Sequence, residues 1–159
     1  MELRQHLENF SDHELVLFQA EAANIFSKLF SPRSYHLYCA VFSDEANGSG
    51  LTDFCSNLIL SGRPLVNAVL LNADSFADVI DTEQYNQDSG LDVSSVAWHI
   101  LARRYDHNVA EVMFNRGGVK SLDGIWERLE KQVGSINFEP DWRLVEATMP
   151  RIYARLHRE

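Results

Sequence analysis

The sequence predicts an all-α protein, because apolar residues recur at helical spacing, helix start and stop signals stand at most junctions, and alternating strand patterns are scarce. We expect a single compact domain over residues 1–159, built from roughly seven to nine short helices with room for one short strand pair. A chain of 159 residues is long enough to bury one sizeable hydrophobic core.

The first strong helix signal begins at Ser11. Ser11 and Glu14 have the spacing of a capping box, in which each side chain reaches the other residue's backbone N–H. The apolar stripe behind this cap consists of Leu15, Phe18, Ala22, Ile25 and Leu29. Pro32 ends this helix, and Ser31 followed by proline at the first helical position starts the next one.

Residues 43–60 join an acidic, glycine-rich turn to an amphipathic helix. The apolar face of that helix consists of Leu51, Phe54, Cys55, Leu58 and Ile59. Ser49 is expected to be its N-cap, and Gly62 is expected to follow its last turn. Arg63 and Pro64 then restart a helix at once.

The middle of the chain is less regular. Asp74 or Ser75 is expected to cap a short helical turn, and the very polar residues 81–91 are typical of a surface loop. Asp92 is expected to cap the helix that follows. Residues 109–114 fit a helix or a short strand, since their apolar pattern does not separate the two.

The C-terminal third carries further helix signals. Ser121 is expected to cap a helix that has Trp126 on its apolar side and Gly134 after its end. Pro140 and Pro150 are each good first helical positions.

Composition narrows the classes of function. The formal net charge of −9 opposes nucleic acid and anionic membranes and favours a basic protein partner. No apolar run approaches the ~20 residues of a membrane span, and the start carries no signal peptide, so we expect a cytoplasmic protein. Cys39 and Cys55 both lie among apolar residues and are interpreted as buried thiols of a reducing compartment.

The acidic turn matches a calcium loop only in part. An EF-hand loop has oxygen ligands at its first, third and fifth positions and a glycine at its sixth. With Gly48 as the sixth residue, the ligand positions are Ser43, Glu45 and Asn47. The twelfth position is then Phe54, which cannot coordinate a cation. We therefore expect no calcium site in this turn.

The same turn lacks the features of a phosphate loop. A P-loop carries Lys and then Ser or Thr after its last glycine, whereas here Leu51 follows Gly50. The acidic residues Asp44, Glu45 and Asp53 would also repel a phosphate. We interpret the stretch as a turn that a helix N-cap closes.

No spacing typical of a metal or nucleophile site occurs. The sequence has no C-x-x-C, no H-x-x-x-H and no G-x-S-x-G motif. His36 and Cys39 lie three residues apart, and we interpret them, together with Cys55, as a satisfied histidine and buried thiols. We predict no metal and no cofactor.

A cationic patch stands near the end of one predicted helix. His99 and Arg103 lie one helical turn apart, next to Arg104 and His107. The patch could hold a carboxylate or a phosphate, or it could be a solvated helix face whose arginines favour the helix C-terminus. Both interpretations stay open.

Three stretches resemble a known bacterial family, the one catalogued as domain of unknown function 4240. They read SDHELVLFQAEAANIFSKLF, YHLYCAVF and GLTDFCSNLILSGRPLVNAVLLNADSFADV, and the closing MPRIYARL is also similar. The family's motif of a Gly-aromatic-x-x-Phe helix, a Leu-Ile-x-x-Gly-Arg step and an Asp-Ser-Leu-Ala-like turn corresponds here to Gly50, Leu51, Phe54, Leu58, Ile59, Gly62, Arg63, Asp74, Ser75 and Ala77.

One departure from the family concerns the acidic turn. The family carries a Ser-Asp-Asp run before the Gly-aromatic pair and an Arg and a Trp in the helix after it. The matching positions here are Asn47, Gly48 and Ser49, and then Cys55 and Asn57. The resemblance implies a fold and no mechanism, because the family's activity is unknown.

The leading hypothesis is a small cytoplasmic protein that acts by binding. It would be a regulatory or immunity-type module that covers a basic partner, and no complete catalytic or cofactor motif argues for an enzyme. Its contact surfaces would be the polar loop 81–91 and the acidic turn with Asp44, Glu45 and Asp53.

The alternative is an enzyme or a small-ligand protein with a pocket near residues 43–54. Arg63, His99 and Arg103 would be its polar groups. A third hypothesis, a structural or self-associating domain, predicts an exposed apolar patch on one helix.

Overall fold

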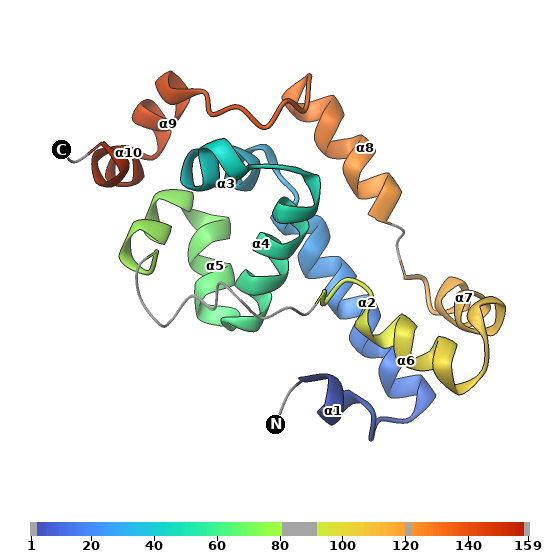
Figure 1. Ribbon diagram of the computed structural model, residues 1–159. Coiled ribbons are helices and arrows are strands. Elements are labelled where there is room, and N and C mark those ends of the chain that lie inside the picture. Colours follow the sequence, from blue (N-terminus) through green and yellow to red (C-terminus); the bar gives the residue numbers. More distant parts are fainter. Residues whose placement is uncertain (1–2, 81–91, 120–121, 158–159) are drawn as a thin grey trace.

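Helices account for all regular structure among residues 3–80, 92–119 and 122–157, which the computed structural model describes (Figure 1). In chain order the helices are α1 (Leu3–Leu7), α2 (Asp12–Leu29), α3 (Pro32–Phe42), the 3₁₀ helix η1 (Ser43–Glu45), α4 (Gly48–Leu60), α5 (Arg63–Leu71), the 3₁₀ helix η2 (Ala73–Asp78), α6 (Val96–Arg104), α7 (His107–Arg116), α8 (Leu122–Val133), α9 (Trp142–Thr148) and α10 (Pro150–Leu156). The all-α prediction is confirmed. No strand occurs in these ranges, so the predicted strand pair is wrong.

The number of helices in the described ranges exceeds the predicted number. Helix α1 has only 5 residues, which is too short to show a repeated apolar stripe in the sequence. Residues 109–114, whose pattern fitted a helix or a strand, lie inside α7. Asp106 starts that helix, because its Oδ1 accepts a hydrogen bond from the Val109 N–H at 2.8 Å.

Buried side chains form two clusters that share the 18-residue helix α2. The large cluster joins the second half of α2 to α3, α4, α5, η2, α8, α9 and α10. The small cluster joins the first half of α2 to α1, α6 and α7, which gather at one end of α2 in Figure 1. Leu15 is buried in the small cluster and Phe26 in the large one, so α2 connects the two.

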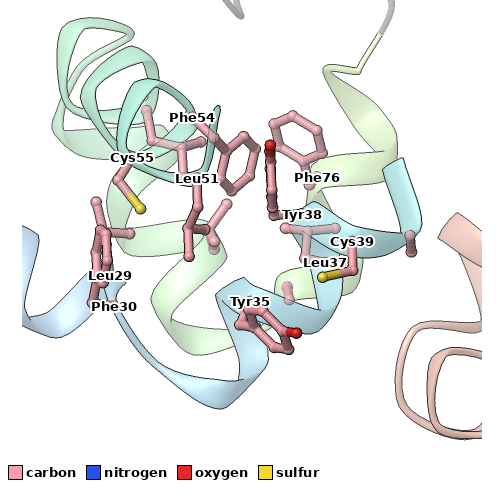
Figure 2. Packing of buried hydrophobic residues seen from close by; sticks show 14 of the residues in the cluster. Leu29, Phe30, Tyr35, Leu37, Tyr38, Cys39, Leu51, Phe54, Cys55 and Phe76 are labelled. Carbon is pink, nitrogen blue, oxygen red and sulfur yellow. The ribbon is translucent and has the colours of Figure 1, made fainter. Parts of the chain in front are cut away.

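The rings of Tyr38, Phe54 and Phe76 lie together inside the large cluster, as Figure 2 shows. The ring centroid of Phe54 lies 5.7 Å from that of Tyr38 and 5.5 Å from that of Phe76. Cys39 and Cys55 are buried in the same cluster as free thiols, as the sequence predicts. Burial raises the pKa of Cys39 to about 11 and also raises the pKa of Cys55, so both thiols stay protonated at neutral pH.

The predicted starts of α2 and α3 are confirmed. The Glu14 N–H donates to Ser11 Oγ at 3.3 Å, and the Ser11 N–H donates to Glu14 Oε2 at 2.8 Å, which completes the capping box. Ser31 caps α3, and Pro32 occupies its first turn.

The start of α4 differs from the prediction. Asn47, and not Ser49, is its N-cap, since Asn47 Oδ1 accepts a hydrogen bond from the Gly50 N–H at 2.9 Å. Ser49 lies inside the first turn, and its hydroxyl donates to the same Asn47 oxygen at 2.7 Å. Asn and Ser are equally good N-caps, and the apolar stripe does not show which one begins the helix.

Asp74 caps a helix other than the one expected. Asn72 caps η2, by accepting a hydrogen bond from the Asp74 N–H at 3.1 Å. The carboxylate of Asp74 is buried and accepts the backbone N–H groups of Arg151 and Ile152 at 2.8 and 3.0 Å. It therefore caps α10, whose first position is Pro150 as predicted. No local sequence pattern predicts a cap from a residue so distant in the chain.

Two further caps correct the sequence expectations. Asp92 holds the turn before α6, where its carboxylate accepts from the Ser94 N–H at 2.9 Å and from the Ser95 hydroxyl at 2.7 Å. Pro140 does not begin a helix, because α9 starts at Trp142 with Asp141 as its N-cap.

Two glycines that were predicted to follow helix ends have the expected backbone conformation. Gly62 and Gly134 have positive φ angles of 102° and 85°, which suits glycine at a helix end. The predicted loop at 81–91 and the predicted cap at Ser121 lie outside the described residues. None of the described helices has both the length and the apolar content that a bilayer crossing requires.

Candidate functional site

An open hollow of about 610 Å³ lies beside the acidic turn that the sequence singles out. We call it the turn hollow. Its wall consists of Ser43, Ala46, Asn137, Phe138, Glu139, Pro140 and Trp142. One side is therefore the link between α3 and α4, and the other side is the segment between α8 and α9 together with the first residue of α9. Residues far apart in the sequence form this site together.

Tyr35 fastens the second wall to the body of the protein. Its hydroxyl oxygen accepts the Phe138 N–H at 3.0 Å and lies 3.4 Å from Asn137 Oδ1, to which it donates. The Phe138 ring lies 5.8 Å from the Tyr35 ring and 6.5 Å from the Tyr38 ring. Burial is the main cause that raises the pKa of Tyr35, so its hydroxyl keeps the proton that it donates.

Phe138 has a strained backbone. Its φ of 58° is in the left-handed region, which a bulky side chain rarely adopts. Such a conformation costs about 1–3 kcal/mol and persists only where the surroundings impose it. Here the bond to Tyr35 and the ring contacts impose it, which directs the segment 137–142 across the turn.

The glycines of the turn permit its close packing against aromatic side chains. A Cβ added at Gly50 would overlap the hydroxyl of Tyr38, and that hydroxyl accepts the Asn47 N–H at 3.0 Å. A Cβ added at Gly48 would lie 3.8 Å from both Phe138 and Trp126. The Asn-Gly-Ser-Gly stretch is therefore a packing element, and it presents no phosphate-loop geometry.

One exposed carboxylate lies in the wall of the turn hollow, and two others belong to the acidic turn and the helix that follows it. Glu139 is in the wall. Glu45 lies two residues after the wall residue Ser43, and Asp53 lies in the second turn of α4. None of these three carboxylates forms an ion pair within the part of the chain that the structure describes. The backbone of Asp44 lies in η1, and its side chain lies outside the described set.

The other predicted site residues are elsewhere. Arg63 is exposed at the start of α5 and does not line the turn hollow. His99 and Arg103 line a second hollow of about 500 Å³, together with Arg4, Asp92 and His107. The structure therefore brings His99 and Arg103 together and separates them from the acidic turn.

The arginines of α6 are engaged with the α1–α2 junction. Arg103 Nη2 lies 2.7 Å from Glu8 Oε1, and Arg104 Nη1 lies 2.8 Å from Asp12 Oδ1. Arg104 also donates to the carbonyl oxygens of Glu8 and Phe10 at 2.8 and 2.9 Å. These contacts give both arginines a partner within the protein, so this helix face anchors the neighbouring α1–α2 junction.

His36 departs from the expected satisfied histidine. Its Nδ1 is buried and has no hydrogen-bond partner among the described residues. Within the same residues, no group of three or more metal-binding side chains converges.

Exposed large apolar side chains are scattered over several helices. They are Leu17, Leu71, Tyr105, Val109, Val112 and Leu156. Among the described elements, α7 exposes both Val109 and Val112, at 37% and 47%. The self-association hypothesis stays a prediction.

Sequence reasoning missed the second wall of the turn hollow. Trp142 at the start of α9 is only partly buried and faces the hollow. The stretch NFEPDW at 137–142 combines aromatic, acidic and proline residues and has no apolar stripe. This composition is the feature of the sequence that could have pointed to the second wall.

Comparisons with known proteins add no relative. Models of known protein families, the curated proteins and the solved structures each yield no match to this chain. The resemblance to the family of unknown function 4240 therefore stays a prediction from the residues that carry it.

Proposed function

We propose that this protein acts by binding a basic protein partner, and that an arginine or lysine of the partner enters the turn hollow. The observation that carries the proposal is the combination of the exposed, unpaired carboxylate of Glu139 with the aromatic side chains of Phe138 and Trp142 in the wall of one hollow. A cation beside an aromatic face and a carboxylate gains from both interactions.

The strained segment supports the same proposal. Phe138 and Trp142 belong to a wall that the left-handed backbone at Phe138 directs across the turn. Backbone strain of this kind clusters at binding sites, where the surroundings impose it.

Net charge supports the choice of partner. A chain with a formal charge of −9 attracts a basic protein from a distance, which speeds association and makes it depend on salt. We place this interaction in the cytoplasm, whose reducing conditions suit the two free thiols Cys39 and Cys55. We propose no role for nucleic acid or a membrane.

The alternative of an enzyme or small-ligand site near residues 43–54 keeps one supporting observation, the volume of the turn hollow. Its expected polar groups Arg63, His99 and Arg103 are not in the wall. The remaining polar side chains there belong to Ser43, Asn137 and Glu139, and we assign no chemical step to them.

The test is affinity capture with a matched pair of variants, read by quantitative mass spectrometry. Glu139→Gln combined with Glu45→Gln removes one charge in the wall of the turn hollow and one in the adjacent acidic turn. Glu111→Gln combined with Glu130→Gln removes two exposed charges on α7 and α8 and serves as the control.

The wild type and the control should retain the same basic protein in about 50 mM salt and release it in about 500 mM salt, since screening weakens exposed charge pairs. The first variant should retain roughly two- to tenfold less of it. Equal capture by both double variants, or capture that salt does not weaken, would contradict the proposal.

A further inference from the structure

Basic side chains gather in the hollow on the small cluster, against the acidic balance of the whole chain. Four of its eight wall residues are basic, namely Arg4 of α1, His99 and Arg103 of α6, and His107 of α7. The formal net charge of the protein is −9, so this concentration of basic groups is local. The volume of about 500 Å³ is within the range for small-molecule sites. We call this site the cationic hollow.

One carboxylate holds the two guanidinium groups of the hollow close together. Glu8 Oε1 lies 2.7 Å from Arg103 Nη2 and 3.7 Å from Arg4 Nε. One negative charge therefore meets two positive charges. Both Nη atoms of Arg4, and Nε and Nη1 of Arg103, have no hydrogen-bond partner among the described residues. These nitrogens remain donors for a second anion, and Glu8 already restricts the two side chains that carry them.

Two imidazole rings complete the basic side of the hollow. The Trp98 ring lies 5.1 Å from the His99 ring and 4.9 Å from the His107 ring, so packing on one indole positions both imidazoles. Neither imidazole makes a hydrogen bond within the described residues, and each can offer a ring N–H. Both histidines are exposed, as are Arg4 and Arg103, so a dissolved ligand reaches all four side chains.

The rest of the wall is polar or small. The carboxylate of Asp92 accepts the Ser94 N–H at 2.9 Å and the Ser95 hydroxyl at 2.7 Å. Asp92 and Ser95 both line the hollow and keep further acceptor lone pairs, which suit the hydroxyl groups of a ligand. The apolar wall residues are Val96 and Ala102, whose small side chains offer little contact to an apolar body.

We propose that the cationic hollow binds a small phosphate monoester with a hydroxyl-bearing body. The phosphate contacts the guanidinium groups of Arg4 and Arg103 and the imidazoles beside them, and the hydroxyl groups face Asp92. The basic donors come from three helices, which suits the three terminal oxygens and two charges of a phosphate better than a planar carboxylate with one charge. This site lies on the small cluster, apart from the turn hollow, and does not depend on the basic partner.

The test is a titration of the full chain with glycerol 3-phosphate, followed by NMR of the histidine ring C–H signals. The pH is about 7.5, where a phosphate monoester carries close to two charges, and the ionic strength is held at about 0.1 M. Glycerate replaces the phosphate by a carboxylate, glycerol removes the charge, and inorganic phosphate removes the body. His157 at the end of α10 is the internal reference, because it lies outside the hollow.

A pair of variants tests the arginine contact. Arg4→Gln removes one guanidinium, and its pair with Glu8 is long and exposed, so the fold should tolerate the change. Arg116→Gln is the matched control, because Arg116 is an exposed arginine at the end of α7 and does not line the hollow.

Glycerol 3-phosphate should shift the signals of His99 and His107, and not that of His157, with a dissociation constant on the order of 1 mM. Glycerate should bind about tenfold more weakly, inorganic phosphate about threefold more weakly, and glycerol should cause no shift. Arg4→Gln should weaken binding about three- to tenfold, and Arg116→Gln less than about twofold. No binding, equal shifts of all histidines, or equal binding of glycerate or inorganic phosphate would overturn the proposal. The ligand comparison uses the wild type alone, so it decides even where a variant fails to fold.

Discussion

The two ends of α2 are held by different interactions. At the large cluster, aromatic rings pack in the interior and a buried carboxylate, Asp74, caps a helix from across the chain. At the small cluster, mostly aliphatic side chains pack, and surface ion pairs of Arg103 with Glu8 and of Arg104 with Asp12 tie α6 to the α1–α2 junction. The large cluster therefore depends on burial, and the small cluster depends in part on surface charge.

The largest effect is expected for Phe54→Ala in the large cluster. Phe54 is 1% exposed and contacts the rings of Tyr38, Phe42 and Phe76. Its loss should lower the free energy of unfolding by about 3–5 kcal/mol, as for other buried aromatics. Urea denaturation followed by circular dichroism measures this change. A loss below about 1 kcal/mol would show that the aromatic interior is not what holds this end together.

Asp74→Ala is expected to have the second largest effect. It removes the acceptor of two backbone N–H groups at the start of α10, and a buried cap of this kind contributes about 2–3 kcal/mol. Asp78→Ala is the control, because Asp78 is exposed in its pair with Arg151 and should contribute less than about 1 kcal/mol. Equal losses in thermal unfolding would contradict the capping role.

Helix signals in the sequence predicted most of this architecture, because caps and apolar stripes are local. The capping box at Ser11 and the helix starts at Pro32 and Pro150 depend only on neighbouring residues, and the structure confirms all three. The role of Asp74 could not be predicted, since its partners lie more than seventy residues away.

The site was predicted only in part for the same reason. The acidic turn was identified from its own residues, yet its opposite wall at 137–142 comes from another part of the chain. His99 and Arg103 do share a hollow, because residues one helical turn apart lie on one face. No spacing in the sequence could tell that this face lies away from the turn.

Gly117→Ala probes the contact between α7 and α2 at the small cluster. A Cβ at Gly117 would overlap the Cγ1 methyl of Val16, so alanine should cost about 1–3 kcal/mol through overpacking. The control is Gly124→Ala in α8, where nothing lies near the added Cβ and alanine should stabilise by about 0.5–1 kcal/mol. Stabilisation by both changes would mean that α7 is not packed closely on α2.

The smallest expected effect belongs to Tyr105→Phe. The hydrogen bond from the Tyr105 hydroxyl is the main cause that lowers the pKa of Asp12, and the Arg104 bond follows. Without it the pKa of Asp12 should rise toward its usual 3.8. Carboxylate ¹³C NMR across pH measures this rise, and Glu14, which Ser11 stabilises, should not change.

The sign of the resulting pH dependence follows from the lowered pKa. A carboxylate with a depressed folded-state pKa stabilises the fold above its unfolded pKa and loses that contribution as pH falls through the folded value. The wild type should therefore exceed Tyr105→Phe in stability at neutral pH, and the difference should vanish in acid. A difference that grows below pH 3.8 would contradict the role of this bond.

The most direct measurement of the binding proposal uses the indole N–H signals of the tryptophans. A tetra-arginine peptide should shift the signal of Trp142, which lines the turn hollow, and leave the signal of Trp98 in the small cluster unchanged. The shift should weaken in Glu139→Gln and in high salt. An unchanged Trp142 signal, or a shift of Trp98 alone, would contradict the turn hollow as the site that receives a basic partner.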